Sequence, residues 1–88
     1  MPAETVVITG AAAGVGRATA RAFGRRGACI GLLARGVEDL NDAASEIEAA
    51  GGTALVLPTD MADSDAVEAA AEAVERRFGP IDIWVNCA

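Results

Sequence analysis

The stretch that decides the fold is Thr9-Gly10-Ala11-Ala12-Ala13-Gly14-Val15-Gly16, which lies between an apolar run and a helical pattern. The preceding run, residues 6–8, is typical of a buried strand, and the following pattern predicts a helix over about 15–26. Glycine lets a backbone turn sharply and lets a ligand approach the main chain closely. Free N–H groups and the positive dipole end of a helix favour an anion at such a turn. The stretch therefore predicts a site for a nucleotide phosphate, with Thr9 capping or bracing the turn.

Beyond this turn, short apolar runs alternate with helical periodicity along the rest of the chain. Strands are expected over 5–8, 29–34, 53–57 and 81–85. A second helix is expected to end at Gly51-Gly52, and a third to run from Asp63 or Ser64, either of which suits an N-cap, to residue 78. Three strand–helix–strand units imply a parallel sheet with right-handed crossovers. We therefore expect an α/β fold of the Rossmann type, with helices on both faces and strand order 3-2-1-4.

The last expected strand leaves one edge of the sheet open. This strand would lie beside the first one, and its outer edge would be apolar. Exposed edges of that kind are normally covered or paired. We therefore expect Trp84 to belong to a core that parts of the sheet beyond these residues complete. Asp82 is expected at the start of the strand, away from the ligand edge.

Composition excludes several classes of protein. A net charge of −6 and a pI near 4.4 argue against nucleic acid as a partner. No apolar run approaches the roughly 18 residues of a membrane span, and no secretory signal opens the chain. Cys29 and Cys87 are expected at opposite ends of the sheet, as ordinary buried thiols in a reducing cytoplasm rather than a disulfide or metal site.

The chain also lacks most acid–base side chains, because it has no Tyr, no Lys and no His. The glycine turn is not a Walker-type loop, since Arg17 follows Gly16 and no Gly-Lys-Ser/Thr is present. Ser45 and Ser64 lie on or before helices, in places unsuitable for catalysis. The 88 residues are therefore predicted to bind a nucleotide but to contain no catalytic group.

Four features in register carry a resemblance to a known family. They are the Thr-Gly-x-x-x-Gly-x-Gly pattern at 9–16, Arg35 after the second strand, Asp60 after the third, and Asn86-Cys87-Ala88 after the fourth. Together they resemble the short-chain dehydrogenase/reductase family. The resemblance spans the whole chain but only the first third of a typical member. It implies that residues 1–88 are the N-terminal part of a single dinucleotide-binding Rossmann domain whose remainder is absent.

The resemblance implies a set of cofactor-binding residues and no catalytic or metal-binding residue. Three glycines make the pyrophosphate turn, Asp60 contacts the adenine amino group with Met61 beside it, and Asn86 lies near the cofactor ribose. Cys87 stands where the family has the second asparagine of an Asn-Asn-Ala-Gly motif. The expected cofactor-binding residues are Gly10, Ala12, Gly14, Val15, Gly16, Arg35, Asp60, Met61, Asn86 and Ala88.

The choice of cofactor depends on charge after the second strand. NAD-preferring relatives carry an aspartate at the tip of this strand, where it accepts from the ribose hydroxyls. This chain has Ala34 there, followed by Arg35. An arginine fork pairs bidentately with a phosphate, so we expect NADP(H) rather than NAD(H). The alternative is that Arg35 is a solvated loop residue. Arg17, just inside the first helix, either helps to hold phosphate or lies on the surface.

The resemblance implies an oxidoreductase that transfers hydride between the nicotinamide and a small carbonyl or alcohol substrate. The Tyr and Lys of the family's Tyr-x-x-x-Lys motif fall beyond residue 88, so the 88 residues alone should be inactive. Two alternatives stay open, namely a truncated, non-catalytic nucleotide-binding module and a fragment that pairs with a separately encoded remainder. A complete protein of this family is expected to be cytoplasmic, with a homo-oligomer possible.

Overall fold

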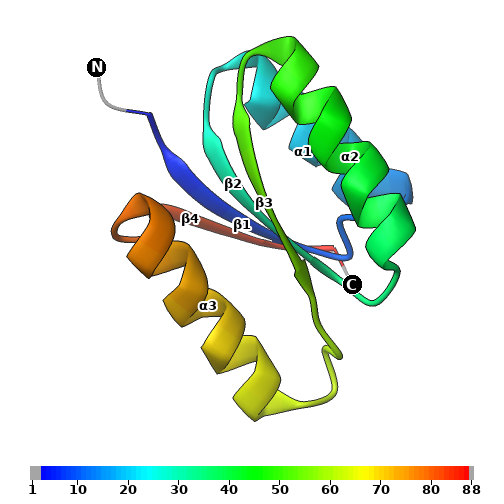
Figure 1. Cartoon of the computed structure of the whole chain (residues 1–88), viewed down its shortest axis with the longest axis vertical. Coiled ribbons are helices and arrows are strands. Elements are labelled where there is room, and N and C mark those ends of the chain that lie inside the picture. The colour runs from blue at the N-terminus through cyan, green and yellow to red at the C-terminus, as the bar shows by residue number, and fades with distance from the viewer. Residues whose placement is uncertain (1–2, 88) are drawn as a thin grey trace.

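The structure is a computed structural model that describes residues 3–87. Its four strands and three helices are β1 (Thr5–Thr9), α1 (Gly14–Arg25), β2 (Cys29–Ala34), α2 (Val37–Ala50), β3 (Thr53–Pro58), α3 (Ser64–Phe78) and β4 (Ile83–Asn86). All strand pairs are parallel, in the order β3-β2-β1-β4 (Figure 1). The predicted Rossmann-type arrangement is confirmed, with helices on both faces of the sheet.

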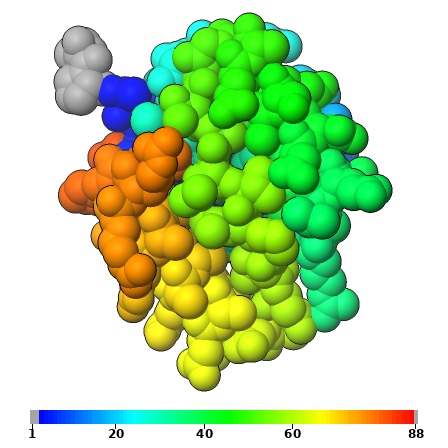
Figure 2. Space-filling view, in the orientation of Figure 1, coloured from blue at the N-terminus to red at the C-terminus, as the bar shows by residue number. Residues whose placement is uncertain are grey.

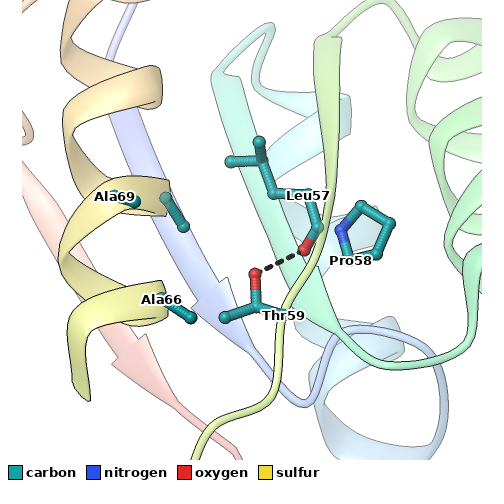
Figure 3. Close-up of a pocket in the computed structure, with 6 residues that line it drawn as sticks. Leu57, Pro58, Thr59, Ala66 and Ala69 are labelled. Carbon is teal, nitrogen blue, oxygen red and sulfur yellow. Dashed lines mark hydrogen bonds between the residues drawn. The ribbon is translucent and has the colours of Figure 1, made fainter. Parts of the chain in front are cut away.

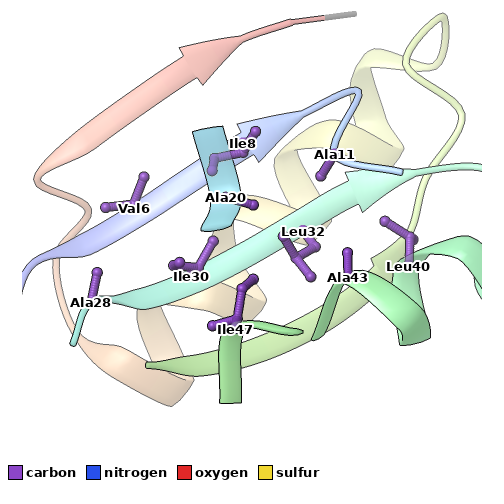
Figure 4. Close-up of a cluster of buried hydrophobic side chains, with 10 residues drawn as sticks. All are labelled: Val6, Ile8, Ala11, Ala20, Ala28, Ile30, Leu32, Leu40, Ala43 and Ile47. Carbon is purple, nitrogen blue, oxygen red and sulfur yellow. The ribbon is translucent and has the colours of Figure 1, made fainter. Parts of the chain in front are cut away.

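The strands are apolar apart from Thr and Asn residues at their ends, because helices cover both faces of the sheet. Successive side chains of a strand point to opposite faces. In β1, Val6 and Ile8 therefore pack toward α1 and α2, whereas Val7 packs toward α3. Figure 4 shows the larger cluster, on the α1 and α2 side. Its buried members are Val6, Ile8, Ala11, Ala20, Ala28, Ile30, Leu32, Leu40, Ala43 and Ile47.

Small residues let the helices approach the sheet and each other closely, which explains how a core with so few aromatic residues is filled. On β2, a Cβ atom at Gly31 would overlap Val74 Cγ2, so glycine here admits α3 against the strand. Between α1 and α2, a Cβ atom at Gly24 would lie 3.2 Å from Ile47 Cα. Larger side chains at either position would push a helix outward and open the core.

The last strand begins at Ile83, two residues later than the sequence predicts, because Asp82 pairs with β1 in a different way. The Asp82 N–H donates to Thr5 O at 2.8 Å, and its carboxylate Oδ2 accepts from the Thr5 N–H, also at 2.8 Å. A side chain thus takes the place of a backbone acceptor at the first step of the β1–β4 ladder. Asp82 lies at the amino end of the sheet, as expected.

The helix ends follow the sequence signals. Asp63, one of the two predicted N-caps of α3, accepts from the N–H groups of Asp65 and Ala66 at 3.0 and 3.2 Å. Gly51 ends α2 with φ of 107°, in the left-handed region that favours glycine. Cys29 and Cys87 are free thiols at opposite ends of the sheet, as predicted, but they are half-buried and not buried, because each lies at or next to a strand end. No helix within residues 3–87 is long and apolar enough to cross a membrane.

Candidate dinucleotide-binding site

The chain leaves β1 through the glycine turn, residues 10–16, in a conformation that needs glycine at particular positions. Gly10 and Gly14 have φ of 64° and 58°, in the left-handed region. Gly14 has open space where a Cβ would lie, so backbone conformation alone restricts this position. At Gly16 a Cβ would overlap the carbonyl group of Gly10. Gly16 therefore allows α1 to start directly against the turn.

No negatively charged side chain of the first turn balances the positive dipole at the amino end of α1. Its N-cap residue, Ala13, makes no side-chain cap, and its first turn contains no acidic residue. In contrast, α2 has two acidic residues in its first turn and α3 has a capping aspartate. Ala12 is half-buried in the turn, while Val15 is 75% exposed at the start of the helix. The first turn of α1 thus has no side-chain cap and no acidic residue to balance the positive dipole end, which fits an anionic group of a cofactor.

The parallel register brings the carboxyl ends of all four strands to one edge of the sheet, here called the carboxyl edge. Thr9 lies between Leu33 of β2 and Asn86 of β4, and Ala34 pairs with Pro58 of β3. The turn is tied to β2 by a 3.4 Å hydrogen bond from Ala11 N to Leu33 O. The predicted residues that follow the strands therefore share one edge. Ala88 lies outside the described residues.

Arg35 and Asp60, which follow β2 and β3, form an ion pair that the sequence did not predict. Arg35 Nη2 lies 2.9 Å from Asp60 Oδ2, with the two side chains 76% and 46% exposed. The other oxygen, Asp60 Oδ1, accepts from the Ala62 N–H at 3.0 Å. The Ala62 N–H, and then Arg35, hold the pKa of the Asp60 carboxyl below its ordinary value. Met61 is half-buried against the α3-side core cluster.

Thr9 serves the site differently from the expectation that it braces the glycine turn. Its buried hydroxyl accepts from the Cys87 N–H at 3.1 Å and donates to Asn86 Oδ1 at 3.2 Å, with Val85 O farther away at 3.5 Å. That expectation was wrong because the parallel register sets Thr9 directly opposite Asn86. Cys87 is half-buried, and its Cβ atom would lie 3.2 Å from a Cβ placed on Gly16. Thr9 thus joins β1 to the end of β4.

Trp84 lies on the outer strand β4, and its expected place in a core that further parts of the sheet complete stays a prediction. It is 38% exposed in the part of the chain that the structure describes, and its indole N–H donates to Asn86 Oδ1 at 2.9 Å. The sequence holds one signal for this contact. Trp84 and Asn86 are two residues apart on one strand, so their side chains share a face of the sheet.

Arg17 forms an ion pair with Glu46 of α2. Its Nε lies 2.7 Å from Glu46 Oε1, and Arg21 Nη1 lies 3.4 Å from the other carboxylate oxygen. The hydrogen bond with Glu46 raises the pKa of Arg17, and the same bond lowers the pKa of Glu46. Of the two alternatives for Arg17, this geometry favours a surface ion pair between helices.

A separate hollow of about 320 Å³ lies between the end of β3 and the first turns of α3 (Figure 3). Figure 2 shows the two elements side by side on one face, with α3 in yellow to orange and β3 in light green. The Thr59 hydroxyl donates to Leu57 O at 2.8 Å, so the one polar side chain of the lining is already satisfied. The lining contains none of the predicted cofactor-binding residues. It consists of Leu57, Pro58, Thr59, Ala66, Ala69 and Ala70.

Comparison with known proteins agrees with this arrangement. A family model described as short chain dehydrogenase matches residues 4–88. The chain belongs to the short chain dehydrogenase family. A short chain dehydrogenase of Pseudocercospora fijiensis is 39% identical over 85 residues, which cover 97% of this chain and 28% of the relative.

Solved structures of this family share the fold closely. A short chain dehydrogenase from Mycobacterium thermoresistibile superimposes with a TM-score of 0.94 at 39% identity, covering 99% of this chain and 34% of that one. L-sorbose reductase from Gluconobacter frateurii, complexed with NADPH and L-sorbose, gives a TM-score of 0.91 at 39% identity over 100% of this chain and 34% of that one. The chain therefore spans about a third of the length of each of these three relatives.

Proposed function

We propose that residues 1–88 form the NADP(H)-binding, N-terminal part of an oxidoreductase that transfers hydride between the nicotinamide and a carbonyl or alcohol substrate. The observation that carries the proposal is the uncompensated amino end of α1, which follows the glycine turn at the carboxyl edge of the sheet, the edge that also carries Arg35 after β2. When bound, the dinucleotide supplies or accepts the hydride. The chain's own residues bind and orient it.

Each predicted residue has a role in this proposal. The N–H groups at the start of α1 and in the glycine turn hold the pyrophosphate, with Ala12 and Val15 beside it. At the adenosine end, Asp60 accepts from the adenine amino group and Met61 lies beside the ring. Asn86 lies near the ribose, and Ala88 is assigned to cofactor binding on the family resemblance alone. These assignments combine the family resemblance with the common edge that the strands share.

The preference for NADP(H) rests on Arg35. Its guanidinium follows β2 and is largely exposed, so a ribose 2′-phosphate can reach it. An arginine pairs bidentately with a phosphate, and a phosphate is a stronger partner than a single exposed carboxylate. The related sorbose reductase was solved with NADPH, which supports the same choice here. A solvated role for Arg35 is the alternative.

The acid–base group of the proposed reaction has to come from residues outside this stretch, because residues 1–88 contain no Tyr and no Lys. We therefore propose that residues 1–88 are inactive alone and form part of one larger dinucleotide-binding domain. Within residues 3–87, β4 pairs only with β1, and Ile83 and Val85 are half-buried. A separately encoded remainder that pairs with this edge, or a non-catalytic module, are the alternatives. The cytoplasmic location and a homo-oligomer stay predictions.

Two measurements test the proposal on the polypeptide that the source cell makes. Its intact mass distinguishes a complete reductase from a short module, because a complete domain of this family is several times heavier than 8.8 kDa. Calorimetric titration with NADPH and NADH then tests the cofactor. Tighter binding of NADPH is the expected result. Equal or tighter binding of NADH would contradict the role of Arg35, and binding of neither would overturn the dinucleotide site itself.

A further inference from the structure

Trp84 makes a directed polar contact at the carboxyl edge. Its indole Nε1 lies 2.9 Å from Asn86 Oδ1, and the residue is 38% exposed within residues 3–87. Buried or half-buried tryptophans normally find a partner for this N–H group. Here the partner belongs to a predicted cofactor-binding residue two positions further along the same strand. This contact gives Trp84 a polar role at the carboxyl edge, in addition to any packing of its ring.

The contact determines which way the Asn86 amide faces. An indole N–H can only donate, so the amide atom opposite it has to be the carbonyl oxygen. The Thr9 hydroxyl approaches the same oxygen at 3.2 Å. Because the Thr9 oxygen already accepts from the Cys87 N–H, at 3.1 Å, its own proton is available for Asn86. Two donors thus converge on Oδ1 and exclude the flipped amide, in which an NH₂ group would face an N–H group.

The other half of the amide is left free to donate. Within residues 3–87, Asn86 Nδ2 donates to no protein acceptor, and the side chain is exposed. Asn86 is the last residue of β4 and lies opposite Thr9. Thr9 is the residue that immediately precedes the glycine turn. The NH₂ group of Asn86 therefore supplies hydrogen-bond donors at the edge where the dinucleotide is proposed to bind.

We propose that Trp84 is a positioning residue for the cofactor: it holds Asn86 so that the amide NH₂, and not the carbonyl, is offered to an acceptor oxygen of the bound dinucleotide. The inference rests on the proposed function and deepens it. Thr9 alone would hold the amide by one longer hydrogen bond, with Val85 O competing for its proton. The indole adds a second donor to Oδ1, and its N–H makes no other hydrogen bond within residues 3–87.

The test removes the indole N–H and keeps an aromatic ring. Trp84→Phe is made in the full-length natural polypeptide, and Kd for NADPH is measured by calorimetry. Loss of one orienting hydrogen bond should raise Kd about threefold to tenfold. Asn86→Asp is the companion variant, since it keeps an acceptor for Trp84 and Thr9 but has no NH₂. It should raise Kd by at least as much while leaving the unfolding midpoint close to that of the parent.

A double-mutant cycle between Trp84 and Asn86 distinguishes a positioning role of Trp84 from a role in packing alone. If Trp84 acts through Asn86, Trp84→Phe should have no further effect on Kd in an Asn86→Ala background. Replacing Trp84 by benzothienylalanine, in which sulfur takes the place of the N–H and the shape is kept, should match Trp84→Phe. This variant also decides the question if the phenylalanine protein does not fold. Arg76→Gln, on the exposed face of α3, is the control and should leave Kd unchanged.

The possible failures are distinguishable. An unchanged Kd in benzothienylalanine protein that binds NADPH would overturn the inference and leave the proposed function standing. The same is true if the loss persists in full in the Asn86→Ala background, because Trp84 would then act by another route. Failure of the parent protein to bind either dinucleotide would overturn the proposed function, and the inference with it.

Discussion

Arg35 and Asp60 neutralise each other across the carboxyl ends of β2 and β3, with 2.9 Å between Nη2 and Oδ2. The charge of Arg35 suits the 2′-phosphate of the proposed cofactor, and the family resemblance assigns Asp60 to the adenine of the same molecule. Their contact links the two assignments, because a phosphate that binds Arg35 competes with the Asp60 carboxylate. An exposed ion pair of this kind contributes little to stability. Replacing the Asp60 carboxylate by a phosphate as the partner of Arg35 therefore costs little free energy.

Replacing Arg35 by alanine should remove the preference for the phosphorylated cofactor. Charge-assisted hydrogen bonds to a phosphate are lost, so the Kd for NADPH should rise about tenfold or more. The Kd for NADH should change little. Arg76→Ala is a matched control, because Arg76 is also a paired arginine and its side chain is 77% exposed, against 76% for Arg35. A preference that survives Arg35→Ala would assign the phosphate to another group.

Replacing Asp60 by asparagine should strengthen the preference for NADPH. The variant removes the competing charge but keeps an amide oxygen that can accept from adenine. From the usual worth of an exposed ion pair, the ratio of NADH to NADPH Kd values should increase about twofold to fivefold. Inorganic phosphate binding, followed by chemical shifts, gives an independent readout. In an Arg35→Ala background the effect should be smaller, and an equal effect there would show that the ion pair is not its cause.

The pKa of Asp60 should show the separate effects of its two partners, the Ala62 N–H and Arg35. This pKa lies below the ordinary value, first because of the Ala62 N–H and then because of Arg35. Arg35→Ala should therefore raise the pKa only part of the way, as measured by carbon NMR of the carboxyl group. Since the folded pKa is the lower one, the associated stability is fully present above the unfolded value of about 3.9 and is lost as pH falls through the folded pKa. A full return to the ordinary value would contradict the leading role of the backbone N–H.

The fold was predictable because its signals are local and mutually consistent. The glycine turn after a short apolar run, Gly51 at a helix end and the cap before α3 each mark a boundary within a few residues. Strand–helix alternation then leaves few topologies, since crossovers between parallel strands are right-handed. The start of β4 was misplaced because the Asp82 side chain, and not its sequence neighbours, closes the ladder with Thr5.

The pairings within the site were not predictable in the same way. Sequence pattern places Arg35 and Asp60 at one edge, but only the register of β2 with β3 determines that they meet. The direction of the Thr9 hydroxyl depends likewise on the register of β1 with β4. Side-chain hydrogen bonds between distant segments follow from three-dimensional geometry, which propensity and periodicity do not encode.

Two glycines of the turn should respond differently to alanine, because different physical reasons restrict them. Gly14→Ala places a Cβ in open space at a φ of 58°, so the cost is backbone strain of about 1–2 kcal/mol in the free energy of unfolding. Gly16→Ala drives a Cβ into the Gly10 carbonyl and forces α1 away from the turn, so it should cost more. Urea unfolding of both variants measures the difference. NADPH titration should show a larger loss of affinity for Gly16→Ala, since it displaces the helix end that holds the pyrophosphate. Equal stability and equal affinity in the two variants would mean that α1 does not rest on the Gly10 carbonyl as the structure has it.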